Sequence, residues 1–158
     1  MNLEALKKPT APFKHALLAT PSETADSMAK LESQGPTVRF VRGRKATTKQ
    51  QLFDEVSAAL QFPYYFGENW DALAECLSEL PGLKMGAGFV LVLTDAVRLL
   101  DNADPLDVKT FIDLLDGAIA SRDEHGKKSA HPFHVVFQGE PSDASALAKK
   151  WPGSAPLG

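Results

Sequence analysis

Residues 62–77 read FPYYFGENWDALAECL, an aromatic, glycine-containing segment that runs directly into an acidic amphipathic helix. The helix is predicted over residues 69–80, because at 100° per residue its large apolar side chains share one sector about 60° wide. These side chains are Trp70, Leu73, Leu77 and Leu80. The stretch therefore predicts a helix with one face on a core and the other in solvent.

The opposite face of this helix is acidic, with Asp71, Glu75, Ser78 and Glu79 on it and Glu68 just before it. No Lys or Arg occurs from Gln50 to Leu83, although the chain has 17. The carboxylates in that interval are Asp54, Glu55, Glu68, Asp71, Glu75 and Glu79. A local field of one sign indicates steering of a basic partner, and the plainer alternative is the solvated polar face of any surface helix.

Three successive aromatic residues, Tyr64, Tyr65 and Phe66, precede Gly67. An extended segment cannot point all three rings into one core, so at least one ring is expected in solvent, where tyrosine is a typical interface anchor. Gly67 is expected to allow a positive φ or the close approach of a partner backbone. Asn69 is a suitable N-cap for the helix.

Strands and helices alternate along the rest of the chain. Strands are predicted at residues 15–19, 37–42, 89–93 and 132–137, with the apolar run 89–93 at the centre of the sheet. Helices are predicted after the caps Thr20 and Thr47 or Thr48, after Asp104-Pro105 and over residues 142–151. This order predicts an α/β fold with right-handed parallel crossovers. Residues 1–12 are expected to form a mobile arm, and the last seven a tail.

At 158 residues and a formal net charge of −3, the chain is expected to be one domain that binds no nucleic acid directly. No apolar run is long enough to span a membrane and no leader is evident, so a cytoplasmic location is expected. The single cysteine, Cys76, is interpreted as a small helix residue rather than a reactive thiol. A basic cluster is interpreted as a solvated edge rather than a phosphate site. It consists of Arg39, Arg42, Arg44, Lys45 and Lys49.

A metal site or an enzymatic site is not favoured. The candidate metal ligands are His131, His134 and Glu140, but ring nitrogens spaced i,i+3 on a strand point to opposite faces. Asp71 and Glu75 could form an acid–base pair, but a single convex helix face has no cleft for a substrate. No cofactor and no metal are therefore expected, and a small hydrolase is the alternative from the class of enzymes.

Residues 65–73, YFGENWDAL, resemble the YYGENLDAL signature of the barstar family of ribonuclease inhibitors. The resemblance extends over about residues 37–138 and implies a small parallel sheet of three strands packed by helices, with a fourth strand from the N-terminal extension left open. It implies the division 1–36 (extension), 37–139 (barstar-like domain) and 140–158 (helix and tail).

By the same resemblance, the motif helix and the segment before it block the active site of a basic ribonuclease, with carboxylates standing in for RNA phosphates. The implied partner-binding residues are Tyr65, Gly67, Asn69, Trp70, Asp71, Ala74, Glu75 and Ser78. Ala74 replaces a tryptophan of the family, and Leu80 and Pro81 stand where it has a second one. Asp113 or Asp116 would supply a further acidic contact. The free chain is expected to be monomeric. The alternative is an interaction module of this fold whose partner is not a nuclease.

Overall fold

The computed structural model describes residues 1–80, 87–124 and 132–158, and these form one parallel sheet of five strands. The strands are β1 (Lys14–Leu18), β2 (Thr37–Arg42), β3 (Phe89–Thr94), β4 (Phe133–Gly139) and β5 (Ala155–Pro156). Their order across the sheet is β2-β3-β4-β1-β5, and each neighbouring pair is parallel. The predicted α/β class and parallel sheet are confirmed.

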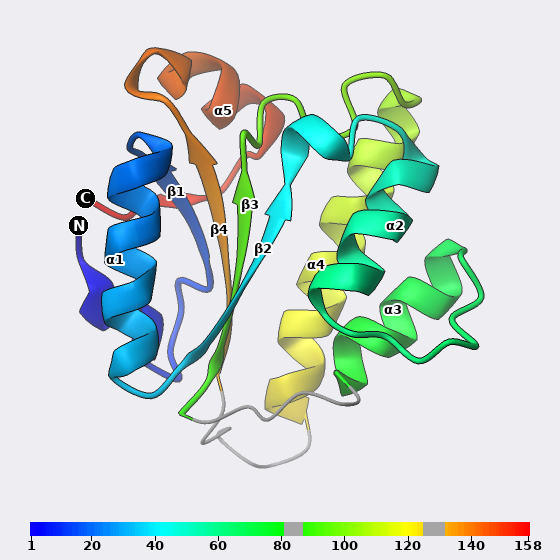
Figure 1. Ribbon diagram of the computed structural model, residues 1–158, viewed down its shortest axis with the longest axis horizontal. Helices are drawn as coiled ribbons and strands as arrows, with labels where there is room; N and C mark the ends of the chain where they lie inside the picture. The colour runs from blue at the N-terminus through cyan, green and yellow to red at the C-terminus, as the bar shows by residue number, and fades with distance from the viewer. Residues whose placement is uncertain (81–86, 125–131) are drawn as a thin grey trace.

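Helices cover both faces of the sheet (Figure 1). α1 (Pro21–Ser33) lies on one face, and α2 (Lys49–Ala59), α3 (Trp70–Glu79) and α4 (Pro105–Glu124) lie on the other. α5 (Ala144–Lys150) sits near the carboxyl ends of the strands. Short 3-10 turns are η1 (Leu3–Lys7), η2 (Gly43–Lys45) and η3 (Pro141–Asp143). α1 and α2 both begin with capping boxes, Thr20 with Glu23 and Thr48 with Gln51, and these confirm two predicted helix starts.

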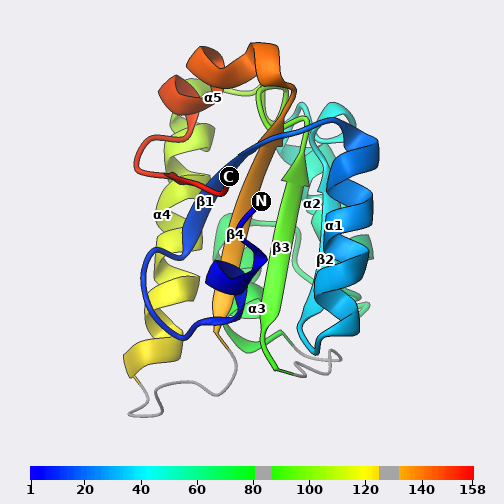
Figure 2. The ribbon, with the colours of Figure 1, turned by 90° about the vertical axis from the view of Figure 1, so that its left-hand side faces the viewer.

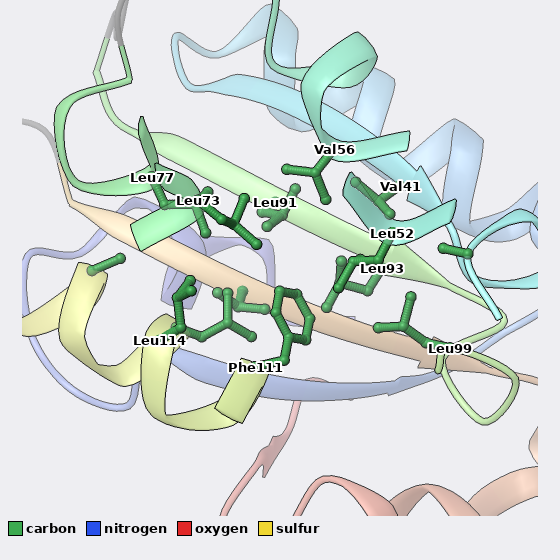
Figure 3. Close-up of a cluster of buried hydrophobic side chains, with 14 of the residues drawn as sticks. Val41, Leu52, Val56, Leu73, Leu77, Leu91, Leu93, Leu99, Phe111 and Leu114 are labelled. Atoms are coloured by element: carbon green, nitrogen blue, oxygen red, sulfur yellow. The ribbon is translucent and has the colours of Figure 1, made fainter. Parts of the chain in front are cut away.

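β3 separates two layers of buried side chains. Leu91 and Leu93 point towards α2, α3 and α4 and join the larger core cluster (Figure 3), whereas Val90 and Val92 belong to the cluster under α1. All the side chains of residues 89–93 are buried, as expected for a strand covered on both faces. The expectation that this run lies at the centre of the sheet is wrong by one position, because β1 and β5 extend the sheet and make β4 the middle strand.

The expected number of strands, three with a fourth left open, is therefore too small. The N-terminal extension does supply a strand, and β1 pairs with β4 from Lys14↔Val135 to Leu18↔Gly139. The fifth strand comes from the C-terminal segment, where Ala155 and Pro156 pair with β1. Figure 2 shows both chain ends on the α1 side of the sheet.

The chain ends are packed, and the predictions of a mobile arm and a tail are wrong. Leu6 and Leu157 are buried in the cluster under α1. Asn2 N donates to Leu157 O at 2.6 Å, and Leu157 N donates to Ala16 O at 2.9 Å. The pattern of prolines and glycines suggested irregular ends, but two leucines bury enough apolar surface to anchor them.

Candidate functional site

Helix α3 begins at a cap made by Asn69. The Asn69 Oδ1 atom accepts from Ala72 N at 2.8 Å, and the Asn69 Nδ2 atom donates to Gly67 O at 3.1 Å. The helix ends at Leu80, which is buried with a φ of 45° and donates its N–H to Cys76 O at 2.7 Å. The predicted helix and its N-cap are confirmed, and the cap joins the aromatic segment to the helix.

The inner face of α3 packs on β3 and α4. Leu73 and Leu77 are fully buried and lie beside Leu91 and Leu114 in Figure 3. Trp70 is half-buried, and its ring contacts Phe53 edge-on with a centroid distance of 5.2 Å.

Two residues of the expected binding set belong to this inner side. Trp70 and Ala74 both pack against the core cluster, so each offers a partner only the part of its side chain left outside the core.

The outer face of α3 carries Asp71, Glu75 and Glu79, all exposed, with Ser78 half-buried beside them. Among the described residues, no Lys, Arg or His lies within 4.0 Å of these three carboxylates. Their mutual repulsion is therefore not relieved by a cation in the described part of the fold, which favours a cationic group from outside.

The other acids of the interval are engaged elsewhere. Gln50 Nε2 donates to Asp54 Oδ1 and to Glu68 Oε1, each at 3.1 Å, so Glu68 is held towards α2. Glu55 forms an ion pair with Arg42 at 2.6 Å, and this pairing holds the pKa of the Glu55 carboxyl below its usual value. The acidic field is thus narrower than the sequence suggests, because it is concentrated on α3.

The aromatic segment presents two rings to solvent. The exposed fractions of Tyr64 and Tyr65 are 102% and 72%, and their rings meet edge to face with centroids 5.7 Å apart. Phe66 turns inward against Phe53 and Phe62. The prediction that at least one of the three rings is exposed is confirmed, and the fold exposes two.

A groove of about 100 Å³ lies between this segment and α3. It brings Tyr65, Gly67 and Glu75 together, three of the eight expected binding residues. Sequence reasoning missed its floor, which includes Ala72 and Cys76. The spacing of residues 72, 75, 76 and 79 along one helical stripe is the signal that could have identified it.

Gly67 does not have the positive φ that was one of its two expected roles. Glu68 has the positive φ, at 49°, and Gly67 has none. A Cβ atom on Gly67 would lie 3.3 Å from Asn69 Nδ2 and 3.5 Å from Ala72 Cβ. The glycine therefore lets the segment approach its own helix cap closely.

The remaining candidates differ in their surroundings. Asp116 forms an ion pair with Lys14 of β1 at 2.8 Å, while Asp113 is exposed and lacks an ion-pair partner within the described ranges. Burial, with a smaller effect of the Glu75 and Glu79 carboxylates, raises the pKa of the Cys76 thiol. A raised pKa keeps the thiol protonated and therefore weakly nucleophilic.

His134, considered as a metal ligand, uses both ring nitrogens inside the fold. Its Nδ1 atom lies 3.0 Å from His15 Nε2, and its Nε2 atom lies 2.8 Å from Lys8 O. His131, the other histidine considered, lies outside the described residues. In the described part of the chain, His, Cys, Asp and Glu do not gather in groups of three that could hold a metal ion, and the helices are all too short or too polar to cross a membrane.

Comparisons with known proteins give a match to one family model and likenesses to several solved structures. The sequence model described as Barstar (barnase inhibitor) matches residues 37–138. No curated protein matches the chain.

The crystal structure of Cdc6p from Pyrobaculum aerophilum is similar at a TM-score of 0.49 and 21% identity, covering 90% of this chain and 38% of that one. The structure of the Aeropyrum pernix Orc1 protein in complex with DNA is similar at a TM-score of 0.49 and 17% sequence identity. The match covers 99% of this chain and 44% of that one. The chain therefore spans less than half the length of either protein.

Proposed function

Because this chain belongs to the barstar family, we propose that it binds a basic ribonuclease and blocks the active site of that enzyme with α3 and the segment before it. The family consists of protein inhibitors rather than enzymes, so binding is the activity to explain. The proposal assigns the contact to Tyr65, Gly67, Asp71 and Glu75, with Asn69 holding the helix start in place.

The observation that carries the proposal is that carboxylates with no cationic partner among the described residues meet exposed aromatic surface at one groove. Glu75 and Glu79 line the groove beside Tyr65, and Asp71 stands one turn before Glu75 on the same helix. Ribonucleases bind phosphates with Arg, Lys and His. A row of carboxylates one helical turn apart can meet such cations, and charge-assisted hydrogen bonds of this kind are among the stronger polar contacts.

The exposed tyrosines supply the apolar part of the contact. Tyr64 and Tyr65 offer large rings with few rotatable bonds, which is the profile of an interface hot spot. Ala74 is small and packs against the core, so the family's tryptophan anchor on the helix is absent here. We therefore assign the main aromatic contact to Tyr65 and the helix contacts to Asp71 and Glu75.

The test is affinity capture from lysate and culture medium of the source cells on the immobilised chain, with bound proteins identified by mass spectrometry and the eluate assayed for ribonuclease activity. The variant Asp71→Asn/Glu75→Gln removes two charges and keeps the size of both side chains. The control Asp26→Asn removes an exposed charge from α1, on the other face of the sheet.

We expect a basic ribonuclease to be retained by the wild type and the control, to be inhibited by them, and to be lost with the double variant. Loss of one partner of a desolvated charge pair lowers binding by about 2 kcal/mol or more. Association with the wild type should also slow as salt is raised. A partner that is not a nuclease, or one retained equally by all three proteins, would contradict the proposal and favour an interaction module of another kind.

A further inference from the structure

We propose that the chain also binds a mononucleotide, in a cleft at the carboxyl ends of β2, β3 and β4. The cleft has a volume of about 280 Å³, just below the usual range for ligand sites, which begins at about 300 Å³. It lies under the first turn of α1, on the face of the sheet opposite α3 (Figure 1). The inference goes beyond the proposed inhibitor function and does not depend on it.

The position follows from the topology of the sheet. The chain leaves β1 for α1 on one face, whereas it leaves β2 and β3 for helices on the other face. Open parallel sheets bind ligands outside the carboxyl ends of their strands, where the crossovers change face. In this sheet the crossovers change face between the neighbouring strands β4 and β1, and the cleft lies beside that point. It is lined by Gln138 of β4, by Thr24 of α1, and by Arg42 and Thr94, the last residues of β2 and β3.

The walls of the cleft are held in place from inside the fold. The Gln138 side chain is buried, its Oε1 atom accepts from Asp95 N at 2.9 Å, and its Nε2 atom donates to Ala19 O at 2.7 Å. This one side chain therefore joins the turn after β3 to the end of β1. A preformed site loses little free energy in ordering its walls when a ligand binds.

Two arginines line one side of the cleft, and Arg44 makes that side suitable for a phosphate. Glu55 holds the Arg42 guanidinium through Nη2–Oε1 and Nε–Oε2 contacts of 2.6 and 3.2 Å, which fixes its orientation but also neutralises its charge. Arg44 is exposed and has no carboxylate within 4.0 Å among the described residues. Arginine matches phosphate oxygens with its planar fork of donors, so the phosphate is assigned to Arg44, because the Nε and Nη2 donors of Arg42 are already used by Glu55 of α2.

The opposite side of the cleft suits the nucleoside. Phe40 keeps 40% of its surface exposed, and its ring lines the cleft from the same face of β2 as Arg42. A base can stack on such a ring. Asp95 also lines the cleft, and its carboxylate would repel a second anionic group but can accept hydrogen bonds from ribose hydroxyls. The cleft therefore suits a ligand with an anionic end, a flat ring and hydroxyl donors, and a nucleoside monophosphate has all three.

The test is calorimetric titration of the full chain with adenosine 5′-monophosphate, guanosine 5′-monophosphate, adenosine and inorganic phosphate. We expect saturable binding of at least one mononucleotide with one site per chain, and weaker binding of adenosine and of phosphate. Arg44→Gln should weaken the nucleotide about tenfold or more, because it removes a charge-assisted contact. Phe40→Ser should weaken it about fivefold or more through lost stacking.

The matched control is Arg98→Gln, which removes an exposed arginine that does not line the cleft and should leave binding unchanged. Arg44 and Phe40 lie at the surface, so unfolding curves should show that both variants keep the fold. Amide chemical shifts of Thr24, Gly43 and Gln138 should move on titration.

Absence of saturable nucleotide binding would overturn the proposal. So would phosphate binding as tight as the nucleotide, equal loss in Arg98→Gln and Arg44→Gln, or shifts confined to α3.

Discussion

At the scale of single residues, two glycines show how strongly the surroundings decide what a side chain can be. A Cβ atom on Gly43 would lie 2.4 Å from the carbonyl oxygens of both Thr94 and Asp95, whereas one on Gly117 would meet nothing within 4 Å. Gly43 lets the turn after β2 pack against the backbone after β3. Gly117 lies on the exposed side of α4, where a glycine only weakens the helix.

Alanine should therefore have opposite effects at the two positions. We expect Gly43→Ala to lower the free energy of unfolding by about 1–3 kcal/mol through overpacking. Gly117→Ala should raise it by about 0.5–1 kcal/mol, because alanine favours the helix. Urea unfolding of both variants, with unchanged slopes, measures the difference. Equal effects of the two substitutions would show that the backbone around Gly43 can move to accommodate a Cβ atom.

Residue-scale predictions from the sequence succeeded where neighbours in the chain supplied the partner. Asn69 caps α3 by accepting a hydrogen bond from the N–H of Ala72, three residues further along the chain. They failed where distant residues compete for the same group, as when Gln50 of α2 holds Glu68 away from the acidic face.

At the scale of elements, α3 is positioned by its cap and by its buried stripe. Asn69 contacts both the aromatic segment, through Gly67 O, and the helix, through Ala72 N. The relative position of Tyr65 and Glu75 across the groove therefore depends on this amide side chain.

We expect Asn69→Ala to lower the free energy of unfolding by about 0.5–2 kcal/mol, because Ala72 N loses its acceptor at the start of α3. Asn69→Asp keeps the acceptor and places a negative charge at the helix N-terminus, so most of the stability should return. Thermal and urea unfolding of the two variants test this. If both substitutions left the free energy of unfolding unchanged, the Asn69 cap would not stabilise α3.

At the scale of the whole molecule, the chain ends complete the layer under α1. Leu157 keeps 1% of its surface exposed, and it packs in the same cluster as Leu6, Met28 and Val92. The C-terminal segment is thus part of the core.

Leu157→Ala should lower the free energy of unfolding by about 2–5 kcal/mol, the usual range for a truncated core leucine. Leu106→Ala is the control, because Leu106 is 69% exposed and its truncation should change stability by less than about 0.5 kcal/mol. The comparison uses urea unfolding at one pH. A loss at Leu157 no larger than at Leu106 would argue that the end of the chain is not packed in solution.

A buried histidine pair makes the stability of this layer depend on pH. Burial, with a smaller effect of His134, lowers the pKa of His15 to about 4, and burial lowers the pKa of His134 despite its hydrogen bond to Lys8 O. In the unfolded chain both imidazoles titrate near the usual histidine pKa of about 6.5. As the pH falls from 6.5 to about 4, the unfolded state therefore binds more protons than the folded state does. The free energy of unfolding falls as a result.

The measurement is the free energy of unfolding at pH values between 7 and 5, above the range in which carboxylates protonate. We expect it to decrease towards pH 5 in the wild type and to change less in His15→Asn/His134→Asn, whatever the absolute stability of that variant. Equal slopes would show that the histidine pair is not the source of the pH dependence.

The sequence by itself determined most of the helices and strands and singled out the stretch that forms the candidate site. Helix caps, apolar periodicity and the 62–77 stretch depend on neighbours within about one helical turn, so α1, α2, α3 and the exposure of a tyrosine could all be predicted. Only the tertiary structure decided which groups from distant segments meet. It placed β1 and β5 on the sheet, paired Glu55 with Arg42, and opened a cleft between α1 and the strand ends. The physical reason is that these contacts join residues far apart in the chain, and no local pattern carries the free energy that selects them.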